Sequence, residues 1–592
     1  MLSVHEKLER IRERLATDKI DAWLINSADP HLCEYPPQHW LVRGYVSGFH
    51  GSAGRLVVTP QHAALFVDSR YWEIAEKATQ GTPIEVIRSG APHAPDLATW
   101  LAAHLPKNAT LASSAQTLSA YEAKELKADL NELDLNLALQ STDIMDELWV
   151  ENRPALPNTE LFELETSSPD RAQKLARLRQ LLASQKCDAV ALTALDDIAW
   201  LTNARAKDID YCPLFVSDMI VTRDEAILFI NPSRVPLALM ERLEKDGITL
   251  FAPDLFIPTL LALKTEGQRF WLDPKRTNAE VAEVLTGNAY EATSPVTLLK
   301  ARKSPGEIAA IREAMFHDGV ALVEFYAELE EDVNAGNMLT EMKCAERLYD
   351  WRHQQPGFLD LSFEAIVAFG PHAAQPHYMP SEASDVTLTR GLLLIDSGAQ
   401  YRTGTTDITR MSAIGELTPE EREHVTLVLK AHIALARATF SEKTTGYELD
   451  RVCRAPLHKA GLDFGHGTGH GVGFVSNVHE GPFHISPCST LPIPKHQLVS
   501  NEPGLYFEGK HGVRIENLIL AVPNEAAEDP SHALKFETLT LCPIDRGTFD
   551  EAALTPEEKA WLNAYHARVY AALFDHVSHR AQRWLTTMCA PL

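Results

Sequence analysis

Five residues in the last third of the chain have side chains of the kind that bind metal ions, and each lies in an unusual local sequence. They are two aspartates, one histidine and two glutamates: Asp396, Asp407, His470, Glu502 and Glu516. Four carboxylates gathered in a folded interior need compensating cations, because otherwise burial forces them to take up protons. Two divalent ions would balance this set. They would also activate a water molecule beside a polarised carbonyl group, which is the chemistry of metal-dependent hydrolysis.

Each of these carboxylates has a simpler explanation when it is considered alone. Asp396 and Asp407 are typical turn or capping residues. Glu502 precedes a proline, and Glu516 lies close enough to Arg514 in the sequence to form an ion pair with it. The metal hypothesis therefore depends on the five residues together. Oxygen donors with one imidazole suit manganese, cobalt, iron or zinc, and the excess of carboxylates favours manganese (Mn²⁺).

The two aspartates follow patterns that predict short strands. The apolar run 392–395 ends at Asp396, as expected for a buried strand that delivers a carboxylate. Asp407 follows a stretch in which Gly398 and Gly404 indicate a turn. Two short strands joined by this turn would bring both carboxylates to one point.

The segment around His470 is the most specific of the five. Residues 466–473 contain four glycines, a density that neither a helix nor a regular strand favours. Glycine here would allow the backbone to approach an ion or a substrate closely. A phosphate-binding loop is the alternative, but the segment has no lysine and lacks the strand–GxxxxGK[ST]–helix context. We therefore predict a metal or substrate site.

Length and composition exclude several classes of protein. A chain of 592 residues is too long for one hydrophobic core and predicts roughly three or four domains. A content of 45% hydrophobic and 23% charged residues is typical of a folded globular protein. The formal net charge of −26 predicts that nucleic acid is not a partner, because its phosphates would be repelled.

Targeting signals and cysteine spacing bear on the cellular compartment. Residues 1–17 form a charged helical pattern without the apolar core of a secretory signal, and no run of about 18 apolar residues occurs. These patterns predict no membrane partner and a cytoplasmic location. The eight cysteines are scattered without a CxxC pair. This spacing favours reduced thiols over a disulfide framework or a zinc–thiolate site.

The front of the chain contains an internal repeat. Residues 7–22 recur as residues 174–189, with several Lys, Leu, Arg and Ala residues at matching positions. Each copy has the pattern of an amphipathic helix followed by an apolar strand. Chance similarity between two helix–strand units is the alternative, but duplication of an α/β domain explains the matches better. Further strand-like runs follow each copy, at 56–58, 64–67, 219–221 and 226–230.

Linker signals predict the domain boundaries. A polar, proline-containing segment at 151–159 marks the first boundary, and the segment 294–305 marks the second. We predict two α/β domains, a catalytic domain and a helical C-terminal extension. Their predicted ranges are 1–150, 160–300, 305–550 and 551–592.

Three helix starts share one sequence signature. Ser304 and Glu307 make a capping box with Pro305 at the first helical position, and the same pattern begins at Thr418 and at Thr555. The last of these opens a tail with an apolar stripe at helical spacing. The stripe is expected to pack on the tail's own catalytic domain, with dimerisation as the alternative. It comprises Trp561, Leu562, Tyr565, Val569, Tyr570, Leu573 and Phe574.

These features together resemble the metallopeptidase family with the pita-bread fold, which includes methionine aminopeptidase, prolidase and Xaa-Pro aminopeptidase. The similarity is strongest to the long, three-domain Xaa-Pro aminopeptidases and extends over almost the whole chain. It implies an α/β (α+β) architecture in which two related creatinase/prolidase-type domains precede a pita-bread catalytic domain. The matching segments are 43–49, 51–54, 68–71, 200–203, 396–401, 404–410, 466–473, 478–482 and 502–504.

The resemblance also implies a role for each site residue. Asp396, Asp407, His470, Glu502 and Glu516 would bind two divalent ions, with Asp407 and Glu516 bridging them. Glu502 would also be the general base toward a hydroxide that bridges the metals, and Arg514 would hold the carboxylates in place. Three histidines would steady the substrate and the tetrahedral intermediate. They are His377, which alone would pass for a surface residue, His466 and His479.

The implied reaction is removal of the N-terminal residue from peptides whose second residue is proline. An Xaa-Pro bond has no N–H and its ring is rigid, so a dedicated pocket is required. The resemblance alone supplies this proline preference, and it also implies a homodimer. Two departures from the usual pattern, Leu505 and residues 495–497, concern loop shape and leave the ligand set intact.

Three alternatives remain within the same fold. Prolidases share these ligands but cleave only dipeptides, and they usually have one N-terminal domain instead of two. Creatinase has the fold without the metals, and some members of the fold are binding modules that have lost ligands. The complete ligand set of this chain argues against both metal-free alternatives.

Overall fold

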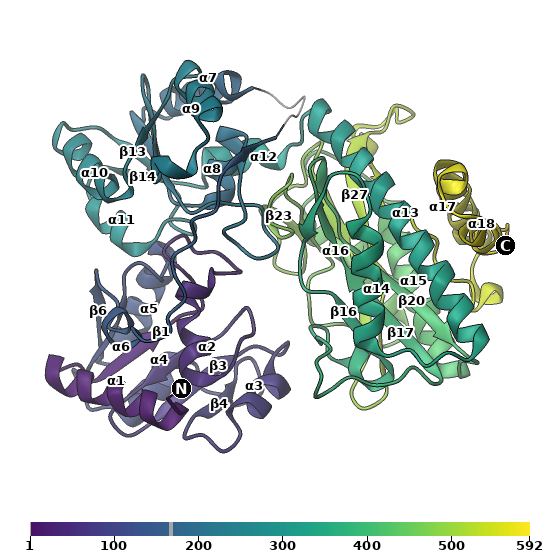
Figure 1. The fold of residues 1–592 in the computed structure, drawn as a ribbon, viewed down its shortest axis with the longest axis horizontal. Coiled ribbons are helices and arrows are strands. Elements are labelled where there is room, and N and C mark those ends of the chain that lie inside the picture. Colours follow the sequence, from purple (N-terminus) through teal and green to yellow (C-terminus); the bar gives the residue numbers. More distant parts are fainter. Residues whose placement is uncertain (1, 165–169) are drawn as a thin grey trace. The chain divides into compact units, whose positions relative to one another are not determined.

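The computed structural model describes residues 2–164 and 170–592 (Figure 1). The chain forms two compact units, one made mainly of residues up to Val296 and one made mainly of residues from Thr297 onward. Among the described residues, no helix combines the length and the apolar character that crossing a membrane requires.

The first unit contains two six-stranded sheets with the same plan. The first sheet has the order β4-β3-β2-β1-β5-β6 and the second has the order β12-β11-β10-β8-β13-β14. In each sheet the strand after the first helix pairs antiparallel on one side and parallel on the other. The outer pairs are parallel in both sheets. Equal order and equal direction support the predicted duplication.

The strands of the first sheet are β1 (Ala22–Ile25), β2 (Arg55–Val58), β3 (Ala63–Val67), β4 (Glu85–Arg88), β5 (Thr110–Ser114) and β6 (Asn136–Gln140). Those of the second are β8 (Ala189–Leu192), β10 (Asp218–Thr222), β11 (Ala226–Phe229), β12 (Ile248–Phe251), β13 (Phe270–Leu272) and β14 (Ala289–Glu291). A short pair, β7 (Phe162–Glu163) and β9 (Ala204–Arg205), lies outside both sheets.

The helices of this unit flank the two sheets, and the predicted helix–strand repeat is confirmed by α1 before β1 and α7 before β8. The helices around the first sheet are α1 (Val4–Asp18), α2 (Val42–Ser47), α3 (Trp72–Thr79), α4 (Leu97–His104), α5 (Ala120–Glu132) and α6 (Met145–Leu148). Those around the second are α7 (Arg171–Ser184), α8 (Leu195–Thr202), α9 (Leu237–Lys245), α10 (Phe256–Thr265) and α11 (Ala279–Val284). Helix α12 (Pro295–Ala301) leads into the second unit.

The second unit holds the predicted ligands on antiparallel sheets. One sheet has the order β16-β17-β20 and a larger one has the order β21-β28-β27-β24-β22-β23. Their strands are β16 (Ile366–Phe369), β17 (Gly391–Ser397), β20 (Ile408–Ile414), β21 (Thr439–Phe440), β22 (Gly469–Gly471), β23 (Glu480–Ile485), β24 (Leu498–Asn501), β27 (Asn517–Pro523) and β28 (Leu534–Thr538). Smaller sheets consist of β15 (Phe358–Leu361), β18 (Ala399–Tyr401) and β19 (Gly404–Thr405), and of β25 (Gly504–Phe507) and β26 (His511–Arg514).

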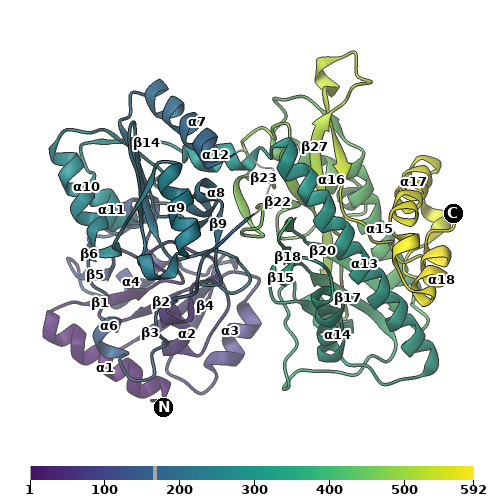
Figure 2. The same cartoon turned by 45° about the horizontal axis from the view of Figure 1, so that its top comes forward.

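Helices pack along these sheets, as both views show (Figures 1 and 2). They are α13 (Pro305–Ala335), α14 (Glu341–His353), α15 (Pro419–Ala436) and α16 (Gly446–Lys459). Outside this layer, α17 (Pro556–Leu573) packs against α13 and α15, and α18 (His579–Met588) packs against α13 (Figure 1). The predicted capping boxes at Ser304, Thr418 and Thr555 are confirmed at the starts of α13, α15 and α17. Each satisfies backbone N–H groups that the first helical turn leaves without partners.

The apolar stripe of the C-terminal tail packs on its own unit, as predicted. Leu562, Tyr565, Val569 and Leu573 of α17 belong to the same core as α15 and the large sheet, and the other aromatic residues of the stripe border it. Burial of this stripe is the main force that holds the extension on the unit.

Candidate metal centre

The two aspartates are brought together by a hairpin, as the sequence predicts. Strands β17 and β20 pair antiparallel, with Asp396 opposite Thr409. Asp407 lies directly before β20, and β18 and β19 form the turn that separates it from Asp396. Gly398 is required in this turn, because a Cβ there would lie 2.1 Å from Ser362 Oγ and from the carbonyl oxygen of Thr406.

The two glutamates are delivered by paired strands of the large sheet. Glu502 follows β24 directly, and Glu516 directly precedes β27, whose end pairs with the end of β24. The sheets meet here, because the Glu516 N–H donates to the Thr409 carbonyl oxygen over 3.1 Å. Thr409 Oγ1 also donates to Glu516 Oε2 over 2.8 Å.

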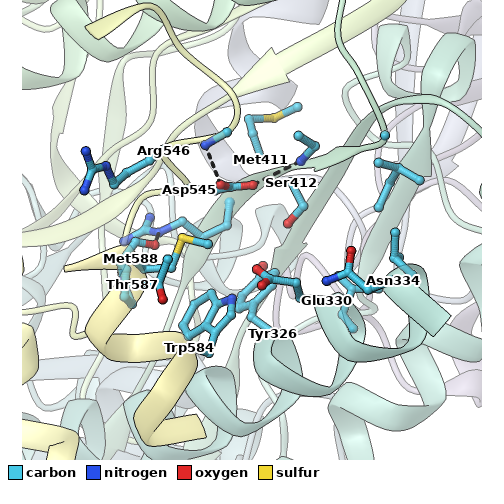
Figure 3. Close-up of a pocket in the computed structure, with 18 residues that line it drawn as sticks. Tyr326, Glu330, Asn334, Met411, Ser412, Asp545, Arg546, Trp584, Thr587 and Met588 are labelled. Atoms are coloured by element: carbon cyan, nitrogen blue, oxygen red, sulfur yellow. Dashed lines mark hydrogen bonds between the residues drawn. The ribbon is translucent and has the colours of Figure 1, made fainter. Parts of the chain in front are cut away.

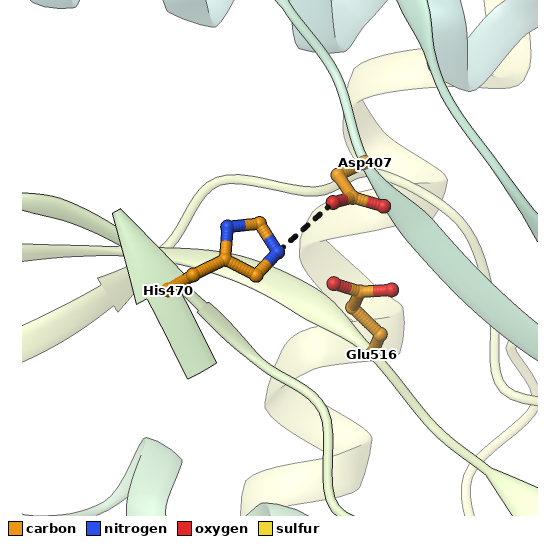
Figure 4. A group of neighbouring side chains, drawn as sticks. All are labelled: Asp407, His470 and Glu516. Carbon is orange, nitrogen blue, oxygen red and sulfur yellow. Dashed lines mark ion pairs between the residues drawn. The ribbon is translucent and has the colours of Figure 1, made fainter. Parts of the chain in front are cut away.

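His470 completes the group from strand β22. Asp407, His470 and Glu516 each offer a ligand atom within 4.8 Å of the others, and Figure 4 shows their side chains converging. His470 Nε2 lies 3.4 Å from Asp407 Oδ2 and 3.3 Å from Glu502 Oε1. Because His470 Nδ1 lies 2.9 Å from the Gly471 carbonyl oxygen, which can only accept, Nδ1 carries a proton and Nε2, which faces the carboxylates, is the candidate ligand atom.

The glycine-rich segment corrects one prediction. Its pattern argued against a regular strand, yet Gly469–Gly471 form β22 between β23 and β24. Glycine is needed for close packing of this strand. A Cβ on Gly469 would lie 1.9 Å from the Ser500 carbonyl oxygen, and one on Gly471 would lie 2.2 Å from that of Glu480. The glycines thus allow the strand that carries His470 to pack between β23 and β24, next to the edge of the sheet.

The electrostatics of the site show that its own residues do not balance its charge. Burial raises the pKa of Asp396 to about 6; the charge of Arg514 opposes this rise, and the charges of Asp407 and Glu502 add to it. Burial and the charge of Asp407 also raise the pKa of Glu502, although His470 opposes this. Burial and the three other carboxylates raise the pKa of Glu516 well above its usual value. The positive charges of Arg514 and His470 therefore do not offset burial and the repulsion between these carboxylates.

Two buried carboxylate oxygens, Asp396 Oδ1 and Glu516 Oε1, have no hydrogen-bond partner in the part of the chain that is described. Buried acceptors without donors are rare in folded proteins, and hard oxygen donors with one imidazole are ligands of divalent metals. The residue set therefore fits divalent cations. The glutamates, the aspartates and His470 would hold them.

Arg514 pairs with Asp396 and not with Glu516, its near neighbour in the sequence. Its Nη2 and Nε donate to Asp396 Oδ2 over 2.7 and 3.1 Å, so the local ion pair with Glu516 considered from the sequence is wrong. Burial lowers the pKa of His466 to about 3, and the charge of Arg514 acts in the same direction. His466 is therefore neutral and can donate or accept a hydrogen bond.

The three predicted substrate-side histidines lie near the ligands to different degrees. The His479 ring packs edge-on against His470, with centroids 4.4 Å apart. His466 lies in the segment before β22, and His377 follows Pro376, whose carbonyl oxygen accepts from Arg514 Nη2 over 3.3 Å. All three thus belong to segments that border the metal ligands.

Tyr506 is a site residue that the sequence analysis missed. Its hydroxyl lies 2.7 Å from His466 Nε2 and accepts from Arg514 Nη1 over 2.7 Å. It also explains Gly504, because a Cβ there would lie 2.5 Å from the tyrosine hydroxyl. The available signal was an aromatic residue shortly after the Glu-Pro-Gly sequence, displaced by one position because Leu505 stands next to the glycine.

A separate cavity of 710 Å³ contains none of the predicted site residues. It lies between α13, β20, α18 and the segment 543–547, and Figure 3 shows Tyr326, Glu330 and Trp584 along one side. The carboxylate of Asp545 in its wall accepts hydrogen bonds from the N–H groups of Ala413 and Gly547. The carboxylates of the metal centre are thus distinct from this cavity.

Family profiles match nearly the whole chain. The profile described as metallopeptidase family M24 matches residues 309–523, and the C-terminal region of peptidase M24 matches 532–592. Two creatinase/prolidase N-terminal domain profiles match residues 7–145 and 152–307.

Relatives and solved structures agree with these matches. Aminopeptidase P2 of Arabidopsis thaliana is 36% identical, with 100% of this chain and 89% of that protein covered. Xaa-Pro aminopeptidase ApepP of Drosophila melanogaster is 33% identical over the full length of both chains. The crystal structure of X-prolyl aminopeptidase from Caenorhabditis elegans, described as a cytosolic enzyme with a di-nuclear active site, matches with a TM-score of 0.95 at 32% identity and 100% coverage of both chains.

The fold and the site thus define a metallopeptidase with duplicated N-terminal domains. The chain belongs to metallopeptidase family M24. The predicted family and the predicted fold class, two creatinase-type domains followed by a pita-bread catalytic domain, are both confirmed.

Proposed function

We propose that this chain is an Xaa-Pro aminopeptidase that removes the N-terminal residue from peptides with proline at the second position. The observation that carries the proposal is the convergence of Asp407, His470 and Glu516 within 4.8 Å, beside Glu502 and Asp396. The names of the full-length relatives in Arabidopsis and Drosophila support the substrate class.

Two divalent ions, most favourably manganese, would be held by Asp396, Asp407, His470, Glu502 and Glu516. Such ions supply an activated water and a polarised carbonyl when they are bound. The Caenorhabditis elegans structure is described as having a di-nuclear active site, and this supports the number of ions.

The protein's own side chains would perform the proton transfers. Glu502 would accept the proton of the attacking water as general base, since its carboxylate lies beside His470 among the candidate metal ligands. Ser500 Oγ donates to Glu502 Oε1 over 2.9 Å and fixes the orientation of this carboxylate.

The neighbouring histidines would bind and orient the substrate. His466, His479 and His377 lie in segments bordering the candidate ligands, where an imidazole N–H could donate to a developing negative charge. Arg514 holds Asp396 in place and, through Tyr506, is linked to His466. These contacts hold the side chains of Asp396, Arg514 and His466 in position before the substrate binds.

Cleavage of defined peptides tests the proposal. Protein stripped of metal and supplied with manganese is given an Arg-Pro-Pro oligopeptide or the dipeptide Gly-Pro, and a Glu502→Gln variant serves as the matched control. We expect metal-dependent release of free arginine that falls by roughly 10²–10⁴-fold in the control. Cleavage of Gly-Pro alone would assign the chain to the prolidases. No cleavage of either peptide despite bound metal would overturn the substrate class.

A cytoplasmic location and a homodimer are further parts of this proposal. The Caenorhabditis elegans structure is described as that of a cytosolic enzyme, and this supports the location. Light scattering coupled to size exclusion tests the dimer. A mass close to 65.7 kDa would contradict it, because that is the mass of one chain.

A further inference from the structure

A buried polar network lies behind the two glutamates of the metal centre. It consists of Arg410, His432, Asn501, Asn517 and Tyr565, which we call the rear network, and all five are buried. Asn501 and Asn517 are cross-strand partners at the ends of β24 and β27. Glu502 directly follows the first and Glu516 directly precedes the second, so the network holds the backbone at both ligands.

His432 of α15 joins the two asparagines. Its Nδ1 lies 3.1 Å from the Asn501 carbonyl oxygen, and Asn517 Nδ2 lies 3.0 Å from its Nε2. The Asn501 amide also donates to the His432 carbonyl oxygen over 2.9 Å. A carbonyl oxygen can only accept, so Nδ1 carries the proton and Nε2 accepts from Asn517. One imidazole therefore makes two different hydrogen bonds, one to each strand.

Arg410 and Tyr565 connect this pair to the C-terminal extension. Arg410 Nη1 donates to the Glu516 carbonyl oxygen over 2.7 Å, and its Nη2 donates to Asn517 Oδ1 over 2.8 Å. The Tyr565 hydroxyl of α17 accepts from Arg410 Nη2 over 2.8 Å and donates to the Cys542 carbonyl oxygen over 2.7 Å. Helix α17 is thus linked to the main chain of Glu516 through a single guanidinium group.

We propose that His432 and Tyr565 are positioning residues of the metal centre: through Asn501, Asn517 and Arg410 they fix the main chain at Glu502 and Glu516, and this is a function of the C-terminal extension. The network contacts the main chain around the ligands, and none of its hydrogen bonds reaches a Glu502 or Glu516 carboxylate oxygen in the described part of the chain. Groups that orient metal ligands typically contribute about 10- to 100-fold to metal affinity or activity.

The inference assumes the metal ions of the proposed function but does not depend on its substrate. The first test therefore measures metal binding directly. Isothermal titration of manganese into chelator-treated full-length protein is compared for the wild type, His432→Leu and His432→Asn. Leucine removes both imidazole hydrogen bonds, whereas asparagine can retain the donor toward the Asn501 carbonyl oxygen. We expect about 10- to 100-fold weaker binding in His432→Leu, with partial recovery in His432→Asn.

A second pair of variants covers the case in which His432→Leu does not fold. Tyr565→Phe removes one hydroxyl from the rear network. Tyr570→Phe is its matched control, because Tyr570 lies on the same helix at the border of the core. We expect weaker manganese binding and a lower kcat for Tyr565→Phe, an unchanged KM, and wild-type behaviour for Tyr570→Phe.

Two outcomes would overturn the inference. One is a folded Tyr565→Phe or His432→Leu protein that binds manganese as tightly as the wild type. The other is an equal loss in Tyr565→Phe and Tyr570→Phe, which would indicate general destabilisation of the helix. Wild-type protein that binds manganese but cleaves no Xaa-Pro peptide would count against the proposed function and leave the positioning role standing.

Discussion

The carboxylate cluster (Asp396, Asp407, Glu502 and Glu516) and the rear network adjoin each other at the ends of β24 and β27. They differ in how completely their buried polar groups are hydrogen-bonded. In the cluster, Asp396 Oδ1 and Glu516 Oε1 lack donors in the described structure, and burial together with neighbouring carboxylates raises the pKa of both residues. In the rear network, Arg410 alone makes hydrogen bonds to five different residues besides its own neighbour Thr409. Asn501 Oδ1 is the exception there.

This difference distinguishes a site built for ions from a site built for rigidity. A folded protein normally pairs its buried polar groups, because each unpaired group costs about 1–3 kcal/mol. A bound cation would satisfy the unpaired acceptors of the cluster, whereas within the described chain the rear network satisfies all but one of its buried side-chain polar atoms, Asn501 Oδ1, without any ligand. The adjacent residues Glu516 and Asn517 therefore differ: Glu516 Oε1 has no hydrogen-bond donor among the described residues, whereas the Asn517 side chain is hydrogen-bonded to Arg410 and His432.

Metal removal is expected to have the largest effect and to separate the two regions most clearly. A chelator should abolish peptide cleavage, and manganese should restore it, because only the cluster depends on ions. Manganese at 100 times its dissociation constant should also raise the free energy of unfolding by about 2.7 kcal/mol. Thermal unfolding with and without the ion measures this. Equal stability in both conditions would contradict the assignment of the cluster.

Asn517→Leu tests the rear network in metal-free protein. It leaves His432 Nε2 without its donor and Arg410 without one acceptor, so we expect a loss of about 1–3 kcal/mol in the free energy of unfolding. Urea denaturation in the presence of chelator measures the change. A neutral substitution would show that the network does not hold these strands.

Glu516→Gln is the matched substitution in the cluster. It should raise the free energy of unfolding of the metal-free protein, whereas Asn517→Leu should lower it. The folded state raises the pKa of Glu516, so metal-free wild-type protein loses stability as pH rises from the ordinary glutamate range through that raised value. Glutamine carries no charge and lacks this loss. We therefore expect metal-free Glu516→Gln to be more stable than the wild type at pH 8, with a smaller difference at pH 5, and to bind manganese poorly.

Tyr506→Phe tests the connection between Arg514, which pairs with Asp396 of the cluster, and His466, which is proposed to bind the substrate. Loss of the hydroxyl removes the contacts to His466 and Arg514 but leaves every carboxylate in place. We expect kcat/KM to fall by about 10-fold, less than for Glu502→Gln. Tyr349→Phe, at an exposed position of α14, is the control and should retain full activity. A loss of manganese binding in Tyr506→Phe would place Tyr506 among the groups that hold the ions.

The last prediction concerns the effect of pH on stability through His566, which directly follows Tyr565 of the rear network on α17. Burial lowers its pKa to about 3, and the charge of Arg410 acts in the same direction. The unfolded chain therefore binds a proton near pH 6.5 that the folded protein does not, so stability should decline as pH falls from about 6.5 toward 3. His566→Gln should show a shallower decline when urea denaturation is compared at pH 7 and pH 5. An identical decline would mean that other groups set the acid sensitivity.

Much of the fold and the residues of the candidate site could be predicted from the sequence because their signals are local. The capping boxes at Ser304, Thr418 and Thr555 lie within four residues each, and the apolar run before Asp396 forms a strand as its pattern indicates. The repeat of residues 7–22 predicted two domains of one plan, and the two sheets share strand order. The ligands were recognisable because their residue types are unusual in apolar surroundings.

Tertiary structure alone decided which of these residues meet. The pairing of Arg514 with Asp396 spans 118 positions, and the contact of Arg410 with Tyr565 spans 155. The strand formed by Gly469–Gly471, the placement of Tyr506 and the rear network depend equally on how distant strands pack. Sequence determined which side chains were available for chemistry, because composition and local patterning set helix starts, strands and charge. Their partners follow from long-range packing, which no local pattern encodes.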